Sequence, residues 1–202
     1  MEGSAPTLRL ATPADASAAE ALMKDSTAAI FPVFYDPQQT ASSVRYVARA
    51  DPMLLADGTY FVLEVGDELV ACGGWSRRGR PYMGSGDAPD DDRLLDPATE
   101  PAHVRAMFVR PDWTRRGLGR RIIEECEAAA RAEGFRQLDL VATLPGVPLY
   151  RACGFTPTGA VEDVKLADGV CLPCLAMSKR IARTRSSAPA RLFRPPAIEG
   201  TG

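Results

Sequence analysis

The stretch from Met107 to Arg121, MFVRPDWTRRGLGRR, constrains the fold more than any other part of the chain. An apolar strand passes through a turn and an arginine-flanked Gly-x-Gly into a segment with helical spacing of its apolar residues. The first N–H groups of a helix lack intrahelical partners, and the helix dipole adds partial positive charge there. Because Gly117 and Gly119 have no Cβ, an anion can approach these groups closely. The stretch therefore predicts a strand–loop–helix unit that binds phosphate.

Two better known phosphate-binding loops do not fit this stretch. A Walker loop requires Gly-x-x-x-x-Gly-Lys followed by Ser or Thr, which the chain lacks, and a dinucleotide fingerprint requires a third glycine where Ile122 stands. A lone Gly-x-Gly also occurs in ordinary turns before surface helices. Four flanking arginines, which stay protonated and donate to phosphate oxygens, favour anion binding: Arg115, Arg116, Arg120 and Arg121.

This loop resembles the signature of the GCN5-related N-acetyltransferase (GNAT) superfamily, Gln/Arg-x-x-Gly-x-Gly/Ala between its fourth strand and third helix. The six positions are occupied by Thr114, Arg115, Arg116, Gly117, Leu118 and Gly119. The resemblance implies that these residues, with Arg120, bind the pyrophosphate of acetyl-CoA. Thr114 replaces the usual Gln or Arg, which leaves its pyrophosphate contact to a hydroxyl or to the neighbouring arginines.

A second segment resembles the same family. Residues Pro145 to Phe155, PGVPLYRACGF, follow the apolar run LDLVATL and end in the family's Tyr-x-x-x-Gly-Phe. Members often carry Asn seven residues before this tyrosine, as a contact to the coenzyme arm, and this chain has Thr143 there. The resemblance implies an α/β (α+β) GNAT fold: a central mixed, mostly antiparallel sheet of six to seven strands, flanked by about four helices and splayed between strands 4 and 5.

The order of elements read from the residues agrees with this expectation. Thr12-Pro13 and Asp36-Pro37 are start signals for two helices, and Gly66-Asp67 is the turn of a hairpin. The expected strands cover residues 7–11, 60–65, 68–76, 103–110, 137–142, 158–166 and 171–178. The expected helices run from 12 towards 24, from 36 to about 49 and over 118–133, with a short helix before residue 155.

Length and composition predict the number of domains, the classes of partner and the location of the protein. A chain of 202 residues with 46% apolar residues suits one domain, which we place at 1–182, followed by a flexible Arg/Pro-rich tail over 183–202. A net charge of -2 gives no general attraction to nucleic acid or to an anionic membrane. The chain has neither an apolar run of about 18 residues nor the pattern of a signal peptide, so we expect a cytoplasmic protein.

Two further features leave alternatives open. Residues 77–101 form a long loop that either attracts a cationic acceptor or is a solvated insertion; its acids are Asp87, Asp90, Asp91, Asp92, Asp96 and Glu100. The five cysteines are an odd number, as expected in a reducing compartment. Cys171-x-x-Cys174 lacks the second ligand pair of a zinc site, so no metal is expected.

The candidate catalytic residues follow from the chemistry of acyl transfer to an amine. By resemblance, the strand residues Met107, Phe108 and Val109 offer main-chain groups to the pantetheine arm and to the thioester carbonyl. Tyr150 is the candidate acid, since a phenol can protonate a departing thiolate; the alternative is a buried aromatic residue. His103 is the candidate base, because strand alternation places it on the face of Arg105, Met107 and Val109 and an imidazole titrates near neutral pH. It is otherwise an exposed bystander, and Glu64 is another candidate carboxylate.

These observations predict an acetyl-CoA-dependent N-acetyltransferase that acts on a primary amine by direct transfer within a ternary complex. A small-molecule amine is favoured as acceptor, with a protein lysine or N-terminus as the other option. The alternative function is a non-catalytic acyl-CoA-binding sensor or regulatory module. The resemblance is also compatible with a homodimer.

Overall fold

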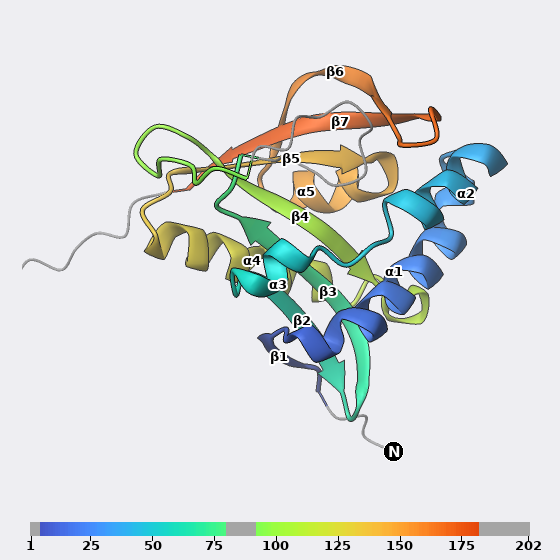
Figure 1. Ribbon diagram of the computed structural model, residues 1–202, viewed down its shortest axis with the longest axis horizontal. Coiled ribbons are helices and arrows are strands. Elements are labelled where there is room, and N and C mark those ends of the chain that lie inside the picture. Colours follow the sequence, from blue (N-terminus) through green and yellow to red (C-terminus); the bar gives the residue numbers. More distant parts are fainter. Residues whose placement is uncertain (1–4, 80–91, 182–202) are drawn as a thin grey trace, which may run out of the picture.

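A seven-stranded sheet in the order β1-β2-β3-β4-β5-β7-β6 forms the centre of the protein (Figure 1). The computed structural model describes residues 5–79 and 92–181, so the predicted tail and three acids of the long loop, Asp87, Asp90 and Asp91, lie outside the described residues. The strands are β1 (Thr7–Leu10), β2 (Tyr60–Val65), β3 (Glu68–Ser76), β4 (Ala102–Val109), β5 (Gln137–Thr143), β6 (Thr156–Lys165) and β7 (Cys171–Arg180).

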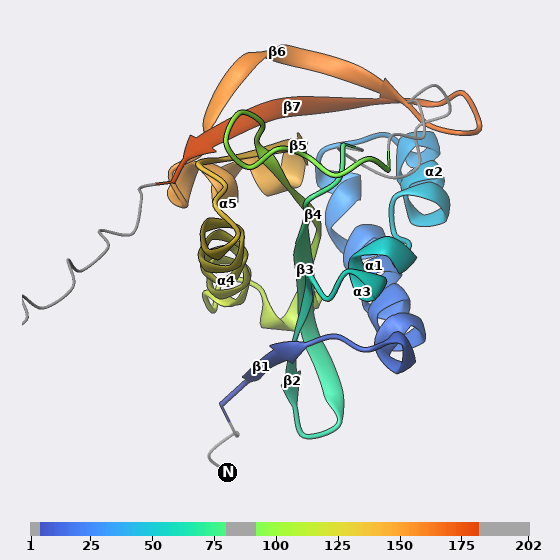
Figure 2. The ribbon, with the colours of Figure 1, turned by 60° about the vertical axis from the view of Figure 1, so that its left-hand side comes forward.

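Five α-helices flank this sheet within the described residues, one more than the sequence predicted. They are α1 (Ala16–Ile30), α2 (Pro37–Tyr46), α3 (Pro52–Ala56), α4 (Leu118–Ala132) and α5 (Val147–Ala152). Figure 2 shows α4 on one face of β2, β3 and β4, and α1 and α3 on the opposite face. This part of the sheet is thus covered on both faces, as expected for strands with apolar residues on each side.

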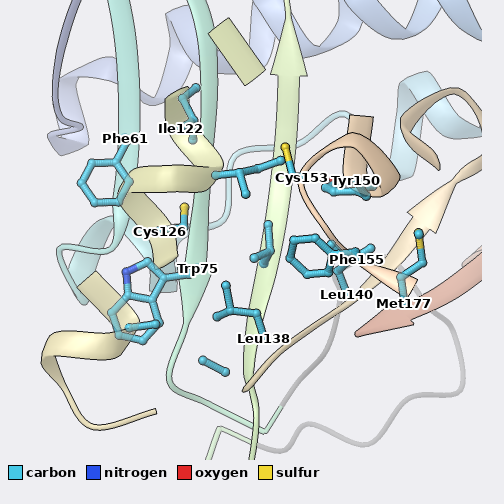
Figure 3. Packing of buried hydrophobic residues seen from close by; sticks show 14 of the residues in the cluster. Phe61, Trp75, Ile122, Cys126, Leu138, Leu140, Tyr150, Cys153, Phe155 and Met177 are labelled. Carbon is cyan, nitrogen blue, oxygen red and sulfur yellow. The ribbon is translucent and has the colours of Figure 1, made fainter. Parts of the chain in front are cut away.

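Two clusters of buried hydrophobic residues lie on these two faces. On the α4 face, Trp75, Ile122 and Phe155 belong to the main core cluster, which Figure 3 shows from close by. On the α1 face, Met23, Leu54 and Val62 form a second cluster. The amphipathic spacing of apolar residues in α4 accounts for the cluster on its side, because one stripe of the helix must pack against the sheet.

The helix starts follow the capping signals in the sequence. The Asp36 carboxylate accepts a hydrogen bond from the Gln39 N–H at 2.7 Å at the start of α2. Asp51 does the same for the Met53 N–H at 2.9 Å at the start of α3. We did not predict α3, although its Asp-Pro start is the same signal. Helix α1 also runs further than predicted, to Ile30, because the residues up to that point are compatible with a helix and the next proline is Pro32.

Strands β4 and β5 are parallel neighbours that pair only where they begin. Their pairs are Ala102 with Leu138 and His103 with Asp139, in strands that lie wholly within the described residues. Further along, β5 pairs among the described residues only with β7, its neighbour on the side away from β4, and this pairing extends as far as Thr143. The C-terminal halves of β4 and β5 therefore separate, as the sequence predicted, and open the sheet between them.

Candidate active site

A cavity of about 740 Å³ occupies the opening between β4 and β5. Its walls come from α1, the segment between α2 and α3, β4, the loop before α4, β5 and α5. All of the predicted site residues except Arg116 and His103 line the cavity. The lining residues among them are Met107, Phe108, Val109, Thr114, Arg115, Gly117, Leu118, Gly119, Arg120, Thr143 and Tyr150. Two segments about thirty residues apart in the sequence thus meet at one site.

The loop before α4 has the backbone conformation of an anion-binding turn. Arg115 and Gly117 both lie in the left-handed region, with φ of 63° and 81°. The Arg121 N–H donates to the Gly117 carbonyl at 3.0 Å, so the N–H groups of the three residues before it stand at the open end of the helix. A Cβ at Gly117 would meet no heavy atom within 4 Å, so the space beside this helix end is open. These features form a concave set of donors suited to phosphate.

The arginines of the loop differ in how they are held. Arg116 lies over the Trp113 ring, 4.5 Å from the centroid, and donates to the Asp112 carbonyl at 3.0 Å. Arg120 donates to the Ala152 carbonyl at 3.0 Å and lines the cavity. Arg115 lines the cavity and makes no hydrogen bond or ion pair with the described residues. Arg115 is therefore the cation most free to meet an anionic ligand.

The Thr114 hydroxyl is already engaged. It donates to the Pro111 carbonyl at 2.9 Å and so closes the turn that precedes the loop. A hydroxyl has one proton to donate, so Thr114 cannot donate to a phosphate while this bond persists. Of the two alternatives for the pyrophosphate contact, the geometry favours the neighbouring arginines.

A β-bulge interrupts β4 beside the cavity. Ala106 has a φ of 53°, and the register with β3 shifts here, since Cys72 faces Phe108 whereas Gly74 faces Arg105. Val104, Met107 and Val109 all pack on the α4 side, and Ala106 and Phe108 pack on the α1 side. A bulge places two successive residues opposite one and thereby reverses the alternation that follows. The prediction that His103 shares a face with Met107 and Val109 was therefore wrong.

The hydroxyl of Tyr60 supports the bulge from the neighbouring strand. It donates to the Ala106 carbonyl at 3.2 Å, and Tyr60 is fully buried. Because a left-handed alanine is strained, a fixed partner for its carbonyl helps to keep the bulge in place. Sequence reasoning assigned no role to Tyr60.

Tyr150 lies on α5, where its ring packs against Phe155 with centroids 5.8 Å apart and an angle of 69° (Figure 3). The residue is 9% exposed and also lines the cavity. Tyr150 is therefore both a buried aromatic residue of the core and a residue of the cavity wall. Its hydroxyl makes no hydrogen bond with the described residues. Burial raises the pKa of Tyr150 above its usual value near 10, so the phenol stays protonated at neutral pH.

The structure places His103 apart from these residues. It lines a second, smaller cavity of about 140 Å³ with Asp139 and Thr158. Burial lowers the pKa of His103 below 6.5, which keeps the imidazole neutral at pH 7. Glu64 pairs with Arg9 at 2.8 Å on β1 and does not line the main cavity. Neither candidate base is in contact with the loop or with Tyr150, and the base role of His103 stays a prediction.

Two of the described acids of the long loop, Asp96 and Glu100, are bound within the loop itself. Glu100 pairs with Arg93 at 2.6 Å and accepts the Asp96 N–H at 2.8 Å. Asp96 in turn accepts from Thr99 at 3.0 Å. Asp92, Asp96 and Glu100 do not line the main cavity. For these three acids, the solvated-insertion reading fits better than an acidic rim around the site.

Sequence reasoning missed the wall of the cavity formed near α1 and α3. It contains Phe31, Phe34, Arg49 and the buried pair Asp51–Arg105, whose charged atoms lie 2.7 Å apart. The Asp51-Pro52 helix start was the available signal, because it fixes the segment that carries Arg49 and Asp51.

Comparison with known proteins agrees with the site. Residues 56–157, just over half of the chain, match the family described as acetyltransferase (GNAT) domain. The chain belongs to the GNAT acetyltransferase family. No curated protein matches the sequence.

Solved structures share the fold of this GNAT protein at low identity. A GCN5-related N-acetyltransferase from Rhodopseudomonas palustris is 20% identical, with a TM-score of 0.66, over 90% of this chain and 99% of its own. The PaiA N-acetyltransferase of Thermoplasma acidophilum, solved with coenzyme A, is 15% identical, with a TM-score of 0.60, over 88% and 100%. The yncA protein of Salmonella typhimurium, solved with acetyl-CoA, is 16% identical, with a TM-score of 0.59, over 93% and 100%.

The protein is therefore an acyltransferase that uses acetyl-CoA. The open helix end, Arg115 and the cavity along β4 fit this donor, which supplies an acetyl group activated as a thioester. Within residues 5–79 and 92–181, no three His, Cys, Asp or Glu side chains are grouped to hold a metal ion. In that same part of the chain, every helix is too short or too polar to span a bilayer.

Proposed function

We propose that this protein transfers the acetyl group of acetyl-CoA to the primary amine of a small molecule, directly and within a ternary complex. The observation that carries the proposal is the continuity of one cavity. It extends from the phosphate-binding loop at Arg115 and Gly117, along β4 and past Tyr150, to the wall near Arg49 and Asp51. A donor and an acceptor can therefore meet in a single space, which is what direct transfer requires.

The lining favours direct transfer over an acyl-enzyme. Among the described residues, no cysteine lines the main cavity, and Cys126 and Cys153 are buried in the core. Burial also raises the pKa of Cys153, which disfavours its thiolate. The amine nitrogen thus bonds to the acetyl carbon as the carbon–sulfur bond breaks, the nitrogen loses one proton and the sulfur gains one.

On the donor side, the backbone performs most of the binding. The first N–H groups of α4 and the Arg115 guanidinium hold the diphosphate, and Arg120 flanks them. Met107, Phe108 and Val109 present main-chain groups to the pantetheine arm. Thr143, at the end of β5, stands where many family members have an Asn that contacts the coenzyme arm. The bulge at Ala106 interrupts the regular pairing of β4 with β3, and an N–H of this part of β4 stabilises negative charge on the carbonyl oxygen.

Tyr150 is the proposed acid. Its raised pKa keeps the phenol proton in place across the pH range of ordinary assays, so the hydroxyl always has a proton to offer the departing sulfur. The hydroxyl has no competing partner among the described residues, so it is free for this contact. The proposed base, His103, requires a water path from the second cavity, because the main cavity does not include it.

The proposed setting is the reducing environment of the cytoplasm. All five cysteines are free, and Cys171 is exposed, a state that persists under reducing conditions.

A panel of small amines tests the proposal. The protein is mixed with acetyl-CoA and each amine, and CoA release is followed with a thiol reagent, while acetyl-CoA binding is measured separately by calorimetry. We expect CoA release that depends on the amine and yields its N-acetyl product. Binding of acetyl-CoA without release over the whole panel would contradict the proposal and favour a non-catalytic sensor.

A further inference from the structure

The wall of the cavity beyond the bulge carries an excess of positive charge. Arg105 and Asp51 form an ion pair with charged atoms 2.7 Å apart, and their side chains are only 5% and 3% exposed. These two charges compensate each other. Asp51 is also the only acidic residue among the described residues that line the cavity. A cationic group of an acceptor therefore finds no uncompensated carboxylate here.

Arg49 supplies the excess charge. It lies just before α3, is exposed and lines the cavity, and its guanidinium makes no hydrogen bond or ion pair with the described residues. The nearby acid Glu20 makes its own contacts with other groups, since it pairs with Lys24 at 2.7 Å and accepts the Ala50 N–H at 3.4 Å. The Lys24 hydrogen bond and, to a smaller extent, the charge of Arg49 lower the pKa of Glu20. The guanidinium of Arg49 is thus available to an anion that enters the cavity.

The same wall is otherwise apolar. Ile30, Phe31 and Val47 line it, and so does Phe34, which is 44% exposed although it is a large apolar side chain. An apolar group in the cavity would cover Phe34 and remove its surface from water. The acceptor end therefore combines one available cation with an apolar surface.

Resting on the proposed function, we propose that the acceptor is a small amine that also carries a carboxylate and an apolar group, as an apolar α-amino acid does. Arg49 binds the carboxylate, and the wall of Ile30, Phe31, Phe34 and Val47 packs against the apolar group. The arginines at the other end of the cavity, Arg115 and Arg120, are occupied by the diphosphate of the donor. Charge repulsion at Arg49 disfavours polyamines.

Three matched acceptors and two variants test this inference. The acceptors are phenylalanine, phenylalaninamide, which lacks the carboxylate charge, and spermidine. The variants are Arg49→Gln and, as a control, Arg45→Gln, which removes an exposed arginine on α2 that stacks on Tyr46 outside the cavity. Circular dichroism and calorimetry with acetyl-CoA show that each variant is folded and binds the donor.

We expect Arg49→Gln to lower kcat/KM for phenylalanine by about tenfold, as for the loss of a charge-assisted hydrogen bond, and to leave phenylalaninamide within about twofold. Arg45→Gln should change neither. The ratio of kcat/KM in the variant to kcat/KM in the unsubstituted protein, taken for each acceptor, cancels the difference in amine reactivity between the two acceptors. An equal loss for both acceptors, no loss for either, or a preference for spermidine in the unsubstituted protein would overturn the inference while the acetyltransferase proposal stands. If no amine releases CoA, the proposed function itself fails.

Discussion

The hydroxyl of Tyr150 can be removed with little disturbance of the structure. The Tyr150 ring packs edge-on against Phe155, and phenylalanine at position 150 keeps this contact. No described residue loses a hydrogen-bond partner when the hydroxyl is removed, so the free energy of unfolding should change by less than about 1 kcal/mol. Any large effect of Tyr150→Phe on the reaction therefore comes from the chemistry rather than from the fold.

The expected effect on the rate is large. General acid catalysis contributes roughly 10²- to 10⁴-fold, so Tyr150→Phe should lower kcat at least about 100-fold, or about 2.7 kcal/mol of transition-state stabilisation. Affinity for acetyl-CoA should stay within about twofold, because the proposed contacts to its diphosphate, Arg115 and the start of α4, do not include the Tyr150 hydroxyl. The assay is CoA release with the best acceptor of the panel, with calorimetry for the donor.

The pH dependence gives an independent check. Burial raises the pKa of Tyr150 in the folded protein above its unfolded value near 10. Below pH 10 the phenol is protonated in both states, and above it the unfolded state loses the proton first, so this residue lowers stability only as the pH rises beyond 10. Measurements between pH 6 and 9 therefore compare folded proteins, and Tyr150 should add no basic limb there. Unchanged turnover of Tyr150→Phe in this range, with donor binding intact, would refute the acid assignment.

The loop before α4 could be predicted from the sequence because its signals are local. The arginines, the two glycines and the apolar spacing of α4 lie within one short stretch, and helix-end chemistry depends on that stretch alone. The bounds of β2 and β3 also agree with prediction, since the Gly66-Asp67 turn fixes both ends of the hairpin.

The bulge in β4 could not be predicted in the same way. It depends on a neighbouring strand, where Gly73 leaves room for the Met107 side chain that a Cβ at this position would overlap. Alternation within β4 alone therefore gave the wrong face for His103.

The acceptor end depends still more on tertiary packing. Arg49, Asp51 and Phe34 come from connections between helices, and only the fold brings them against β4. Their residue types are common in surface loops, and the one local signal, the Asp51-Pro52 helix start, predicts a helix but not its place beside β4.

Three further substitutions test the donor loop, the base and the buried pair. Gly117→Val forces a β-branched residue to adopt a φ of 81°, at a cost of about 1–2 kcal/mol. It should weaken acetyl-CoA binding about tenfold, as measured by calorimetry. Unchanged affinity would contradict the proposal that this loop binds the diphosphate. His103→Ala should lower the rate across pH 6 to 9 if the neutral imidazole accepts the amine proton, and full activity throughout would rule out the base role. Asp51→Asn keeps a side chain that caps the Met53 N–H but removes the charge 2.7 Å from Arg105. Because both side chains are almost fully buried, urea unfolding should show a loss of about 3 kcal/mol. The control is Asp36→Asn, at an exposed cap of α2 without such a pair, and its free energy of unfolding should change by no more than about 0.5 kcal/mol. An equally small loss for Asp51→Asn would contradict the expectation and show that water in the cavity solvates Arg105 well enough to replace the Asp51 carboxylate.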